Sequence, residues 1–589
     1  MEKRMILALV LTAAVVGLTP VLFPSAPPAV RSADSTAVAP IAPVARNAGA
    51  NPPAQAAQPE RAVQTPAVAA SPATGSGDSL PAAPVVPADS TVVTTGLATY
   101  RFVNVGAVPA SLVLHRYNNL ATRGQPVDLG TASGPLLRYR LVTPGDTIDL
   151  SRAAFARTST GEPGLGNPLA YEATIDGYRV FISYTFSEDS YLVGVSGRVD
   201  SPSGGTPGPR FLLVDLPREF PVTEADSVND RRSLAFAFKS ERESSKSVGF
   251  GKLDPGERRL EAAPLTWVAA KSKYFVVGVL TPEGDEPFSE ATFTGGPRTS
   301  REATNAMATV VERVTDDGFA FELYAGPQEW ERMLKVGREF DSVNPYGWKF
   351  MQGFVQPFAT IVMRILLWMH NVLALSYGWV LVIFGVVVRL LLWPLNQKAM
   401  KSSLRMQHIQ PRMQEVQKKH AGNREKQQAE MMKIYKEEGV SPFTAVTGCL
   451  PMLLPMPVLI ALFFVFQNTI EFRGVPFLWL TDISIKDPYY ILPVLMGASM
   501  YVLSWIGLRN APPNPQAKMM SYIFPFMMTF FLMNLASGLN LYYAVQNVAA
   551  LPQQWLIARE RQKMTQTSAK SAAVEPGTRN QKPKPTAKS

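Results

Sequence analysis

Long stretches without a charged side chain dominate the C-terminal part of this 589-residue chain. They cover residues 439–470, 488–508, 519–558 and, apart from Arg389, 377–396. A helix needs about 20 apolar residues to cross a bilayer, so the 40 residues of 519–558 are too many for one helix. The sequence "NLASG" (534–538) supplies a turn between two helices. We therefore predict an α-helical polytopic membrane protein with five spans between residues 375 and 558.

Basic residues predict how these spans are oriented. Ten Lys and Arg lie between residues 398 and 440, two in 509–518 and eight in the polar tail 559–589. Cytoplasmic flanks carry the excess of Lys and Arg, so these segments and the C-terminus are expected in the cytoplasm. The same clustering accounts for the net charge of +10, and we expect no specific nucleic-acid partner. The single cysteine, Cys449, and four scattered His predict no disulfide, no metal site and no other cofactor.

The N-terminus carries a further apolar run. Lys3 and Arg4 precede about 19 uncharged residues, which predicts a transmembrane anchor over residues 1–23 with its N-terminus in the cytoplasm. A cleaved signal peptide is the alternative interpretation, and with either one the next part of the chain is exported. Residues 24–95 are rich in Pro and Ala and poor in large apolar side chains, so we expect a disordered linker.

Short runs of alternating apolar and polar residues fill positions 96–340. Examples are "YRVFISYTF" and "FAFELYAG", with Gly, Pro, Asp and Ser between such runs. This pattern predicts short antiparallel strands and an all-β sandwich domain on the exported side. No grouping of Ser, His and Asp, and no pair of carboxylates, indicates catalysis, so we predict that the protein is not an enzyme.

Two other segments are expected to be helical and amphipathic. Residues 345–372 have an apolar side interrupted by Lys, Gln, Arg and His, which favours a helix in the membrane interface over a poorly apolar span. Residues 398–440 are predicted to form a cytoplasmic helical hairpin with a break at "HAGN". This hairpin is either merely solvated or a docking surface for a nascent chain, a ribosome or lipid headgroups. The candidate docking residues are Arg405, Met406, Met413, Lys418 and Lys419.

Arg389 is the charge that the apolar spans have to accommodate. It lies seven residues before Asn396, or about 10 Å at a rise of ~1.5 Å per residue, which places it in the inner leaflet. From this depth a long Arg side chain can snorkel to the headgroups. Alternatively, the charge is tolerated because it lines a water-filled cavity inside the protein. None of the predicted spans contains an acidic residue that could pair with it.

A polar stripe in the last predicted span bears on this choice. Asn540, Tyr543 and Asn547 recur at helical spacing, and such a stripe by itself often only packs against a partner helix. Together with an Arg that lacks a counter-charge, it favours a hydrated groove. A transporter or channel with an intramembrane Arg site is the alternative function, although we see no paired ion site or inverted repeat. A structural anchor that presents the β domain is a third possibility.

Several motifs, in this order, resemble one known family. "LTWVAAKSKYFVVGVLTP", "FGVVVRLLLWPLNQKAM" and "SGLNLYYAVQNVAALPQQWLI" resemble sequences of the YidC membrane protein insertases. The resemblance covers essentially the whole chain. It implies an ATP-independent insertase of the bacterial inner membrane, with an N-terminal anchor, a periplasmic β-supersandwich domain and a five-helix core.

The resemblance also implies roles for individual residues. In this family a hydrophilic groove is open to the cytoplasm and the lipid, and its Arg, here Arg389, is thought to attract acidic residues in the translocated segment of a substrate. A functional aromatic residue of the last span matches Tyr543, and Gly385 stands where many members carry Thr. The expected groove residues are Arg389, Tyr543, Tyr542, Asn540, Asn547 and Gly385. Expected partners of the monomer are nascent membrane proteins and lipids, with the Sec translocon and the ribosome as further candidates.

Overall fold

The computed structural model describes residues 88–573 with several gaps. These gaps are 123, 131–133, 160, 202–207, 299–300, 317, 345, 348–350, 421, 438–455 and 509–514. The contacts divide the chain into two units, Met1–Pro84 and Val85–Ser589, and all described residues belong to the second. The predicted anchor, most of the predicted linker, Cys449 and the end of the basic tail lie outside the described residues.

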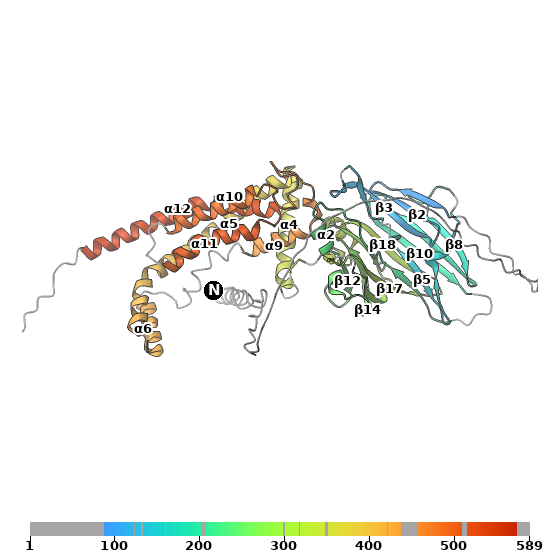
Figure 1. Ribbon diagram of the computed structural model, residues 1–589, viewed down its shortest axis with the longest axis horizontal. Coiled ribbons are helices and arrows are strands. Elements are labelled where there is room, and N and C mark those ends of the chain that lie inside the picture. Colours follow the sequence, from blue (N-terminus) through green and yellow to red (C-terminus); the bar gives the residue numbers. More distant parts are fainter. Residues whose placement is uncertain are drawn as a thin grey trace, which may run out of the picture. The chain divides into compact units, whose positions relative to one another are not determined.

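Antiparallel strands build the N-terminal domain (Figure 1). In the described residues one sheet has the order β1-β2-β3-β4. A 14-stranded sheet follows the path β6-β5-β11-β17-β16-β14-β15-β18-β10-β9-β8-β7, with β12 and β13 attached at β14. The strands are β1 Ser90–Thr94, β2 Ala98–Val103, β3 Val108–Asn118, β4 Pro126–Asp128, β5 Arg138–Val142, β6 Thr147–Asp149, β7 Ala156–Arg157, β8 Leu169–Ile175, β9 Tyr178–Phe186, β10 Leu192–Asp200, β11 Arg210–Asp215, β12 Ala235–Ser240, β13 Lys246–Gly249, β14 Arg258–Lys271, β15 Phe275–Leu280, β16 Phe288–Gly295, β17 Ala306–Val314 and β18 Phe319–Pro327.

The apolar residues that alternate with polar ones in the sequence form the core of this domain. In β9, the predicted "YRVFISYTF" strand, Val180, Ile182 and Tyr184 point into the core. The ring of Tyr184 lies 4.7 Å from that of Phe102 in the four-stranded sheet, and its hydroxyl donates to the carbonyl of Ala107 at 2.6 Å. The two sheets therefore pack against each other. The prediction of a β-rich domain is confirmed, and its finer assignment as a supersandwich stays a prediction.

Two details differ from the expected domain boundaries and content. Strand β1 lies inside the range expected to be a linker, because Ser90–Thr94 pairs along its whole length with β2 and buries Val93. The domain also contains helix α2 (Ser227–Arg232), so it is not all-β. Helix α3 (Trp330–Val336), in contrast, lies within residues 328–342, whose sequence predicts a polar connecting helix. Asp226 caps α2 by accepting the backbone N–H of Asn229 at 3.1 Å, a local bond that strand patterning does not reveal.

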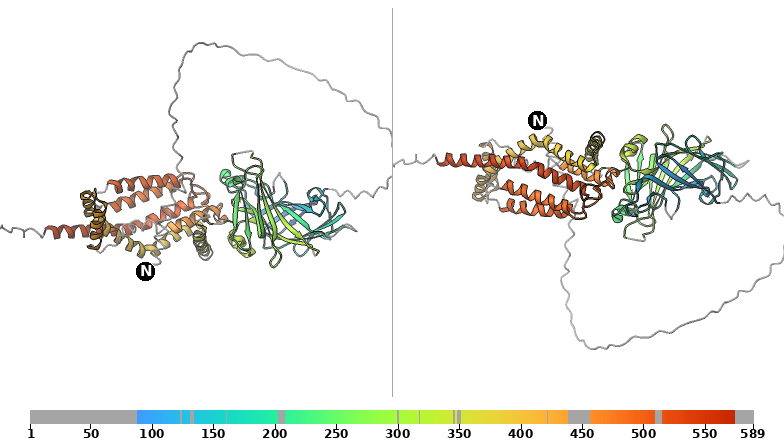
Figure 2. Two further views of the ribbon diagram at one scale, coloured as in Figure 1. Left: turned by 90° about the horizontal axis from the view of Figure 1, so that it is seen from below. Right: turned by 90° about the horizontal axis from the view of Figure 1, so that it is seen from above.

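Helices make up the C-terminal part of the chain. They are α4 Gln352–Leu373, α5 Tyr377–Lys419, α6 Arg424–Glu437, α9 Met456–Asn468, α10 Ile491–Leu508, α11 Pro515–Leu532 and α12 Ser537–Ala573, with 3-10 turns at Leu150–Arg152, Phe250–Lys252, Phe340–Val343 and Ile470–Phe472. Helix α12 packs against both α5 and α10, α11 packs on α10, and α9 contacts α4 and α12 (Figure 2). The predicted turn at "NLASG" separates α11 from α12.

Length and hydropathy single out two spans among the described residues. Tyr377–Lys398 and Ile491–Leu508 are long and apolar enough to cross a membrane, whereas Met456–Asn468 and Ser521–Leu532 are shorter apolar helices. The number of five spans therefore stays a prediction. Helix α4 buries one side, including Val355 and Leu366, and exposes Trp368 and other apolar residues on the other. Its location in the membrane interface also stays a prediction.

Two helices continue through positions where the sequence suggested an end. Helix α5 runs without interruption from the first predicted span into the hairpin, although we placed the end of the span near Asn396. Helix α12 likewise runs to Ala573, well into the basic tail. Neither junction contains a glycine, and its Lys, Gln, Arg and Met residues favour helix, so a change from apolar to polar residues does not end the helix.

The described residues between 398 and 437 form a helical hairpin. Helix α5 ends at Lys419, the chain turns at the "HAGN" break, and α6 packs back against α5. Asn423 accepts the backbone N–H of Lys426 at 3.0 Å and so begins α6. The seam of the hairpin is an apolar cluster of Ile409, Met413, Val416, Met431, Ile434 and Tyr435.

The segment between α9 and α10 contacts the β-rich domain through a buried ion pair. Arg473 Nε donates to Glu224 Oε1 at 2.8 Å, and both side chains are less than a tenth exposed. The same guanidinium donates to the carbonyl of Thr223 at 3.1 Å and lies over the ring of Phe275. A charged group so far from water is stable only because its hydrogen bonds are satisfied.

Candidate functional site

Arg389 is held by a neutral amide on another helix. Its Nη2 donates to Gln553 Oε1 on α12 at 2.9 Å, and the Nε2 of Gln553 donates to the carbonyl of Trp393 on α5 at 3.1 Å. Gln553 is fully buried, whereas Arg389 is partly exposed. Among the described residues no carboxylate forms an ion pair with Arg389. The positive charge is therefore fixed between α5 and α12 without being neutralised there.

One turn earlier, a second amide joins the same two helices. Gln546 Nε2 donates to the carbonyl of Gly385 at 2.9 Å and to the hydroxyl of Tyr542 at 3.1 Å. Gly385 allows α12 to come this close, because a Cβ at this position would lie 3.0 Å from Cγ1 of Val545. Gly385 thus serves helix packing, and the amide of Gln546 supplies a polar contact beside it.

The other predicted residues of the stripe face a different neighbour. Asn547 Nδ2 donates to Ser499 Oγ on α10 at 3.1 Å, and Asn540 Nδ2 donates to the carbonyl of Leu532 on α11 at 3.0 Å. Tyr543 packs against an apolar cluster of α10, α11 and α12 that includes Met496. The expected groove residues therefore do not form one lining. Arg389, Gly385 and Tyr542 lie at the α5–α12 contact, and Asn540, Tyr543 and Asn547 lie toward α10 and α11.

Sequence reasoning did not select the two glutamines as site residues. Tyr542, Gln546 and Gln553 are separated by four and seven residues, which is the spacing of one helix face. This spacing in the sequence indicates a second polar stripe on α12. The second stripe, and not the first, faces Arg389.

Several buried polar atoms of α5 and α12 have no hydrogen-bond partner within the described ranges. They are Arg389 Nε and Asn396 Nδ2 of α5, Gln546 Oε1 at the α5–α12 contact and Asn540 Oδ1 of α12, which lies toward α11. Each unsatisfied polar group is unfavourable in an apolar environment, so such groups are normally bonded to water or to a ligand. Their accumulation distinguishes this helix contact from ordinary apolar packing.

Comparisons with known proteins decide the family. Residues 90–361 match the model described as YidC periplasmic domain, and residues 368–565 match the 60Kd inner membrane protein model. The membrane protein insertase YidC of Chlorobium phaeovibrioides is 31% identical over 77% of this chain and 80% of its own length. This chain belongs to the YidC family of membrane protein insertases. The YidC proteins of Chlorobaculum tepidum (29% identical, covering 83% of this chain and 85% of the relative) and Burkholderia multivorans (32%, covering 67% and 69%) are similarly related.

Two solved structures are also similar. An active YidC insertase with its first transmembrane domain resolved matches 80% of this chain and 93% of its own, at 18% identity and a TM-score of 0.32. A galactose mutarotase-like protein from Lactobacillus casei matches 41% of this chain and all of its own, at 8% identity and a TM-score of 0.28.

Membership in the YidC family confirms the broad predictions made from the sequence. The protein is an inner-membrane insertase rather than an enzyme, and its β-rich domain is the periplasmic domain of the family. The alternatives of a transporter, a channel or a structural anchor do not fit this family. The roles of the individual residues stay predictions.

The predicted docking residues of the insertase lie on the first arm of the hairpin. Arg405, Met406, Met413, Lys418 and Lys419 all belong to α5. Lys418 and Lys419 are exposed, and Met413 packs in the seam against α6. Nothing is described of the side chains of Arg405 and Met406. Lys418 and Lys419 thus give this arm a basic exposed end, whereas Met413 contributes to the packing of the hairpin and not to an exposed docking surface.

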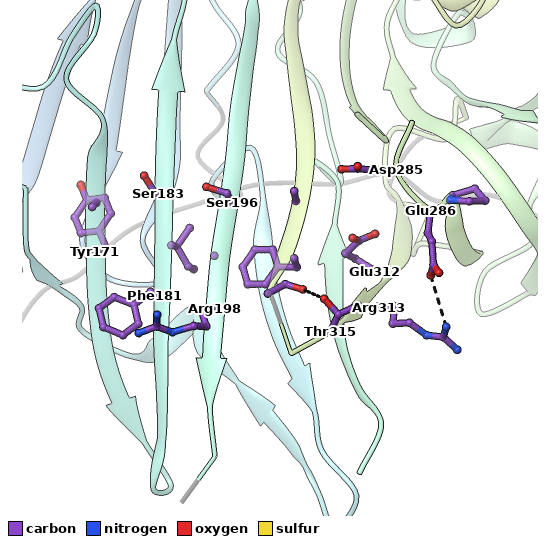
Figure 3. A pocket seen from close by; sticks show the side chains of 17 residues that line it. Tyr171, Phe181, Ser183, Ser196, Arg198, Asp285, Glu286, Glu312, Arg313 and Thr315 are labelled. Carbon is purple, nitrogen blue, oxygen red and sulfur yellow. Dashed lines mark hydrogen bonds and ion pairs between the residues drawn. The ribbon is translucent and has the colours of Figure 1, made fainter. Parts of the chain in front are cut away.

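The periplasmic domain contains a cavity of about 780 Å³ (Figure 3). Tyr171, Ser183 and Ser196 line it from three neighbouring strands, β8, β9 and β10, and Glu312 lines it from β17. Burial raises the pKa of Glu312 to about 8, and the nearby Asp285 adds to this effect. The cavity therefore contains a carboxyl group that holds its proton to a higher pH than an exposed glutamate does.

Proposed function

We propose that this insertase moves hydrophilic segments of its substrates through a hydrated groove at the α5–α12 contact. The observation that carries the proposal is the charge of Arg389, which is bonded to a neutral amide and has no carboxylate partner in the described part of the chain. The unsatisfied Nε of Arg389 and Oε1 of Gln546 at this contact support access of water or substrate. Such a groove reduces the thickness of hydrocarbon that a polar segment has to cross.

The charge would act on acidic residues of the substrate. Two opposite charges about 4 Å apart attract each other several times more strongly near a protein than in bulk water, because the effective dielectric constant is lower. An acidic residue in the translocated segment of a nascent membrane protein would thus be drawn to Arg389. The apolar helix of the same substrate can leave along exposed apolar residues of α5 such as Leu390 and Leu391.

The proposed orientation follows the positive-inside rule. The N-terminus, the hairpin and the C-terminal tail are cytoplasmic, so the basic surface at Lys418 and Lys419 is available to a ribosome, a nascent chain or lipid headgroups. The groove opens on this side. The protein works as a monomer, alone or beside the Sec translocon.

Replacing Arg389 tests the electrostatic role. In proteoliposomes, Arg389→Ala should lower the insertion of a single-span substrate with an acidic exported tail by about tenfold, the effect of losing one charge-assisted hydrogen bond of ~1.4 kcal/mol. The same substrate with a neutral tail should insert almost as well as with the wild-type protein. Arg389→Lys is the matched control that keeps the charge. Equal insertion of both tails by Arg389→Ala would show that the charge has no such role.

A further inference from the structure

Gln553 makes every one of its described hydrogen bonds to one face of α5. Its Oε1 accepts from Arg389, and its Nε2 donates to the carbonyl of Trp393 at 3.1 Å and to Gln397 Oε1 at 3.4 Å. These three α5 residues are spaced four apart, so they lie one above the other on the helix. A single buried side chain of α12 thus spans two turns of α5 around the charge.

The orientation of the Gln553 amide is fixed by this arrangement. Its NH₂ group faces two acceptor oxygens, the Trp393 carbonyl and Gln397 Oε1, so its oxygen is turned toward Arg389. Turning the amide over would bring oxygen against oxygen on one side and N–H against N–H on the other. An amide oxygen holds a guanidinium by a hydrogen bond and leaves its full positive charge, whereas a carboxylate would neutralise it.

We propose that Gln553 is a positioning residue, which holds the Arg389 guanidinium at the groove and keeps it from reaching toward the headgroups. This inference rests on the proposed role of Arg389. The bond to Gln553 occupies Nη2, and Nε is buried without a partner in the described part of the protein. Because Arg389 is partly exposed, the terminal N–H groups that Gln553 does not use, rather than the buried Nε, are available to a carboxylate of the substrate. Gln553 thereby determines the depth in the membrane at which Arg389 binds that carboxylate.

Variants of Gln553 test this in the full-length protein. Gln553→Glu should lower insertion of the acidic-tailed substrate by about tenfold, like Arg389→Ala, because an intramolecular ion pair occupies the charge. Gln553→Met keeps the length of the side chain but not its polar atoms, and it should cause a smaller loss of the same kind. Insertion of the neutral-tailed substrate, measured in the same proteoliposomes, should stay within about twofold of wild type for both variants.

The neighbouring glutamine provides a matched control. Gln554 is one residue further along α12 and lies against Gly507 of α10, so Gln554→Glu introduces the same charge on another face and should change neither substrate. If Arg389→Ala is selective but Gln553→Glu and Gln553→Met behave like wild type, Gln553 does not position Arg389. An equal loss for both tails would mean that Gln553 only stabilises the fold. If Arg389→Ala itself is not selective, the proposed function fails and this inference fails with it.

Discussion

At the scale of single residues, Glu312 links the stability of the periplasmic domain to pH. Its pKa is raised from 4.5 to about 8, chiefly because it is buried. A carboxyl group with a raised pKa in the folded state stabilises the fold fully below its ordinary pKa, and this contribution is lost as the pH rises through the raised value. The domain should therefore lose stability between about pH 4.5 and pH 8, on the order of a few kcal/mol at ~1.4 kcal/mol per pKa unit.

Glu312→Gln should remove this dependence. At pH 9 the variant is expected to unfold at a higher temperature than the wild type, because no charge has to be buried, and at pH 4.5 the two should unfold at nearly the same temperature. Thermal unfolding of the full-length protein in detergent at both pH values measures the difference. Glu241→Gln, which changes an exposed carboxyl group of the same domain, serves as the control. A gain in stability that is equal at both pH values would contradict the explanation.

The sequence predicted the charge of the candidate site but not its immediate partner. Arg389 stands out because any charge in an apolar run requires an explanation. Gln553 taken alone does not, since a Gln near the end of a span is equally explained by contact with the interface, and only its spacing from Tyr542 and Gln546 indicates that it belongs to one helix face. Asn540, Tyr543 and Asn547 have the predicted periodicity, yet they face α10 and α11. Periodicity identifies a helix face, but the rotation of that face toward a particular neighbour depends on packing between helices.

At the scale of the elements, the contact between α5 and α12 depends on a glycine, Gly385, which has no side chain to hold the helices apart. Gly385→Ala would bring a Cβ to 3.0 Å from Cγ1 of Val545 and should destabilise the helix pair by about 1–3 kcal/mol, the usual effect of overpacking. The expected result is a lower unfolding temperature in detergent. The double variant Gly385→Ala/Val545→Ala should recover much of the loss, because it removes the atom that the new Cβ meets.

Gly353 in α4 provides the matched control for this prediction. A Cβ at Gly353 meets nothing within 4 Å, so Gly353→Ala should be neutral or slightly stabilising, as Ala favours helix over Gly. If Gly385→Ala behaves like Gly353→Ala, the close approach of α5 and α12 does not depend on the glycine.

At the scale of the whole molecule, Arg473 connects the helical part to the periplasmic domain. Arg473→Ala would leave the buried carboxylate of Glu224 without its cation, which typically destabilises by about 3–5 kcal/mol. Faster amide hydrogen exchange is expected in residues 472–487 and around Thr223. The control, Arg198→Ala, removes an exposed ion pair with Asp200, whose contribution should be below ~1 kcal/mol. Equal exchange in the two variants would argue against a structural role of the buried pair.

The sequence predicted the kinds of element in both parts, but not how the strands pair. The run "FVVGVL" indicates a strand buried on both faces, and β15 is one. Its neighbours in the sheet are β14 and β18, and β18 lies almost 40 residues further along the chain. Alternation specifies which face of a strand is buried, whereas the choice of partner depends on the combined packing of all strands. The same holds for the buried contact of Arg473 with Glu224, which are 249 residues apart.

The continuity of α5 has a mechanical consequence. Arg389 and Lys419 are 30 residues apart in one uninterrupted helix, which corresponds to about 45 Å along its axis. Because this part of α5 is so long, tilting it by about 5° moves one end by about 4 Å relative to the other. Pro394 and Pro411 lack an N–H group, so they are the points at which this helix bends most easily. A pull on the hairpin would therefore reach the turn that carries Arg389 only in part, because a bend at either proline absorbs some of the displacement.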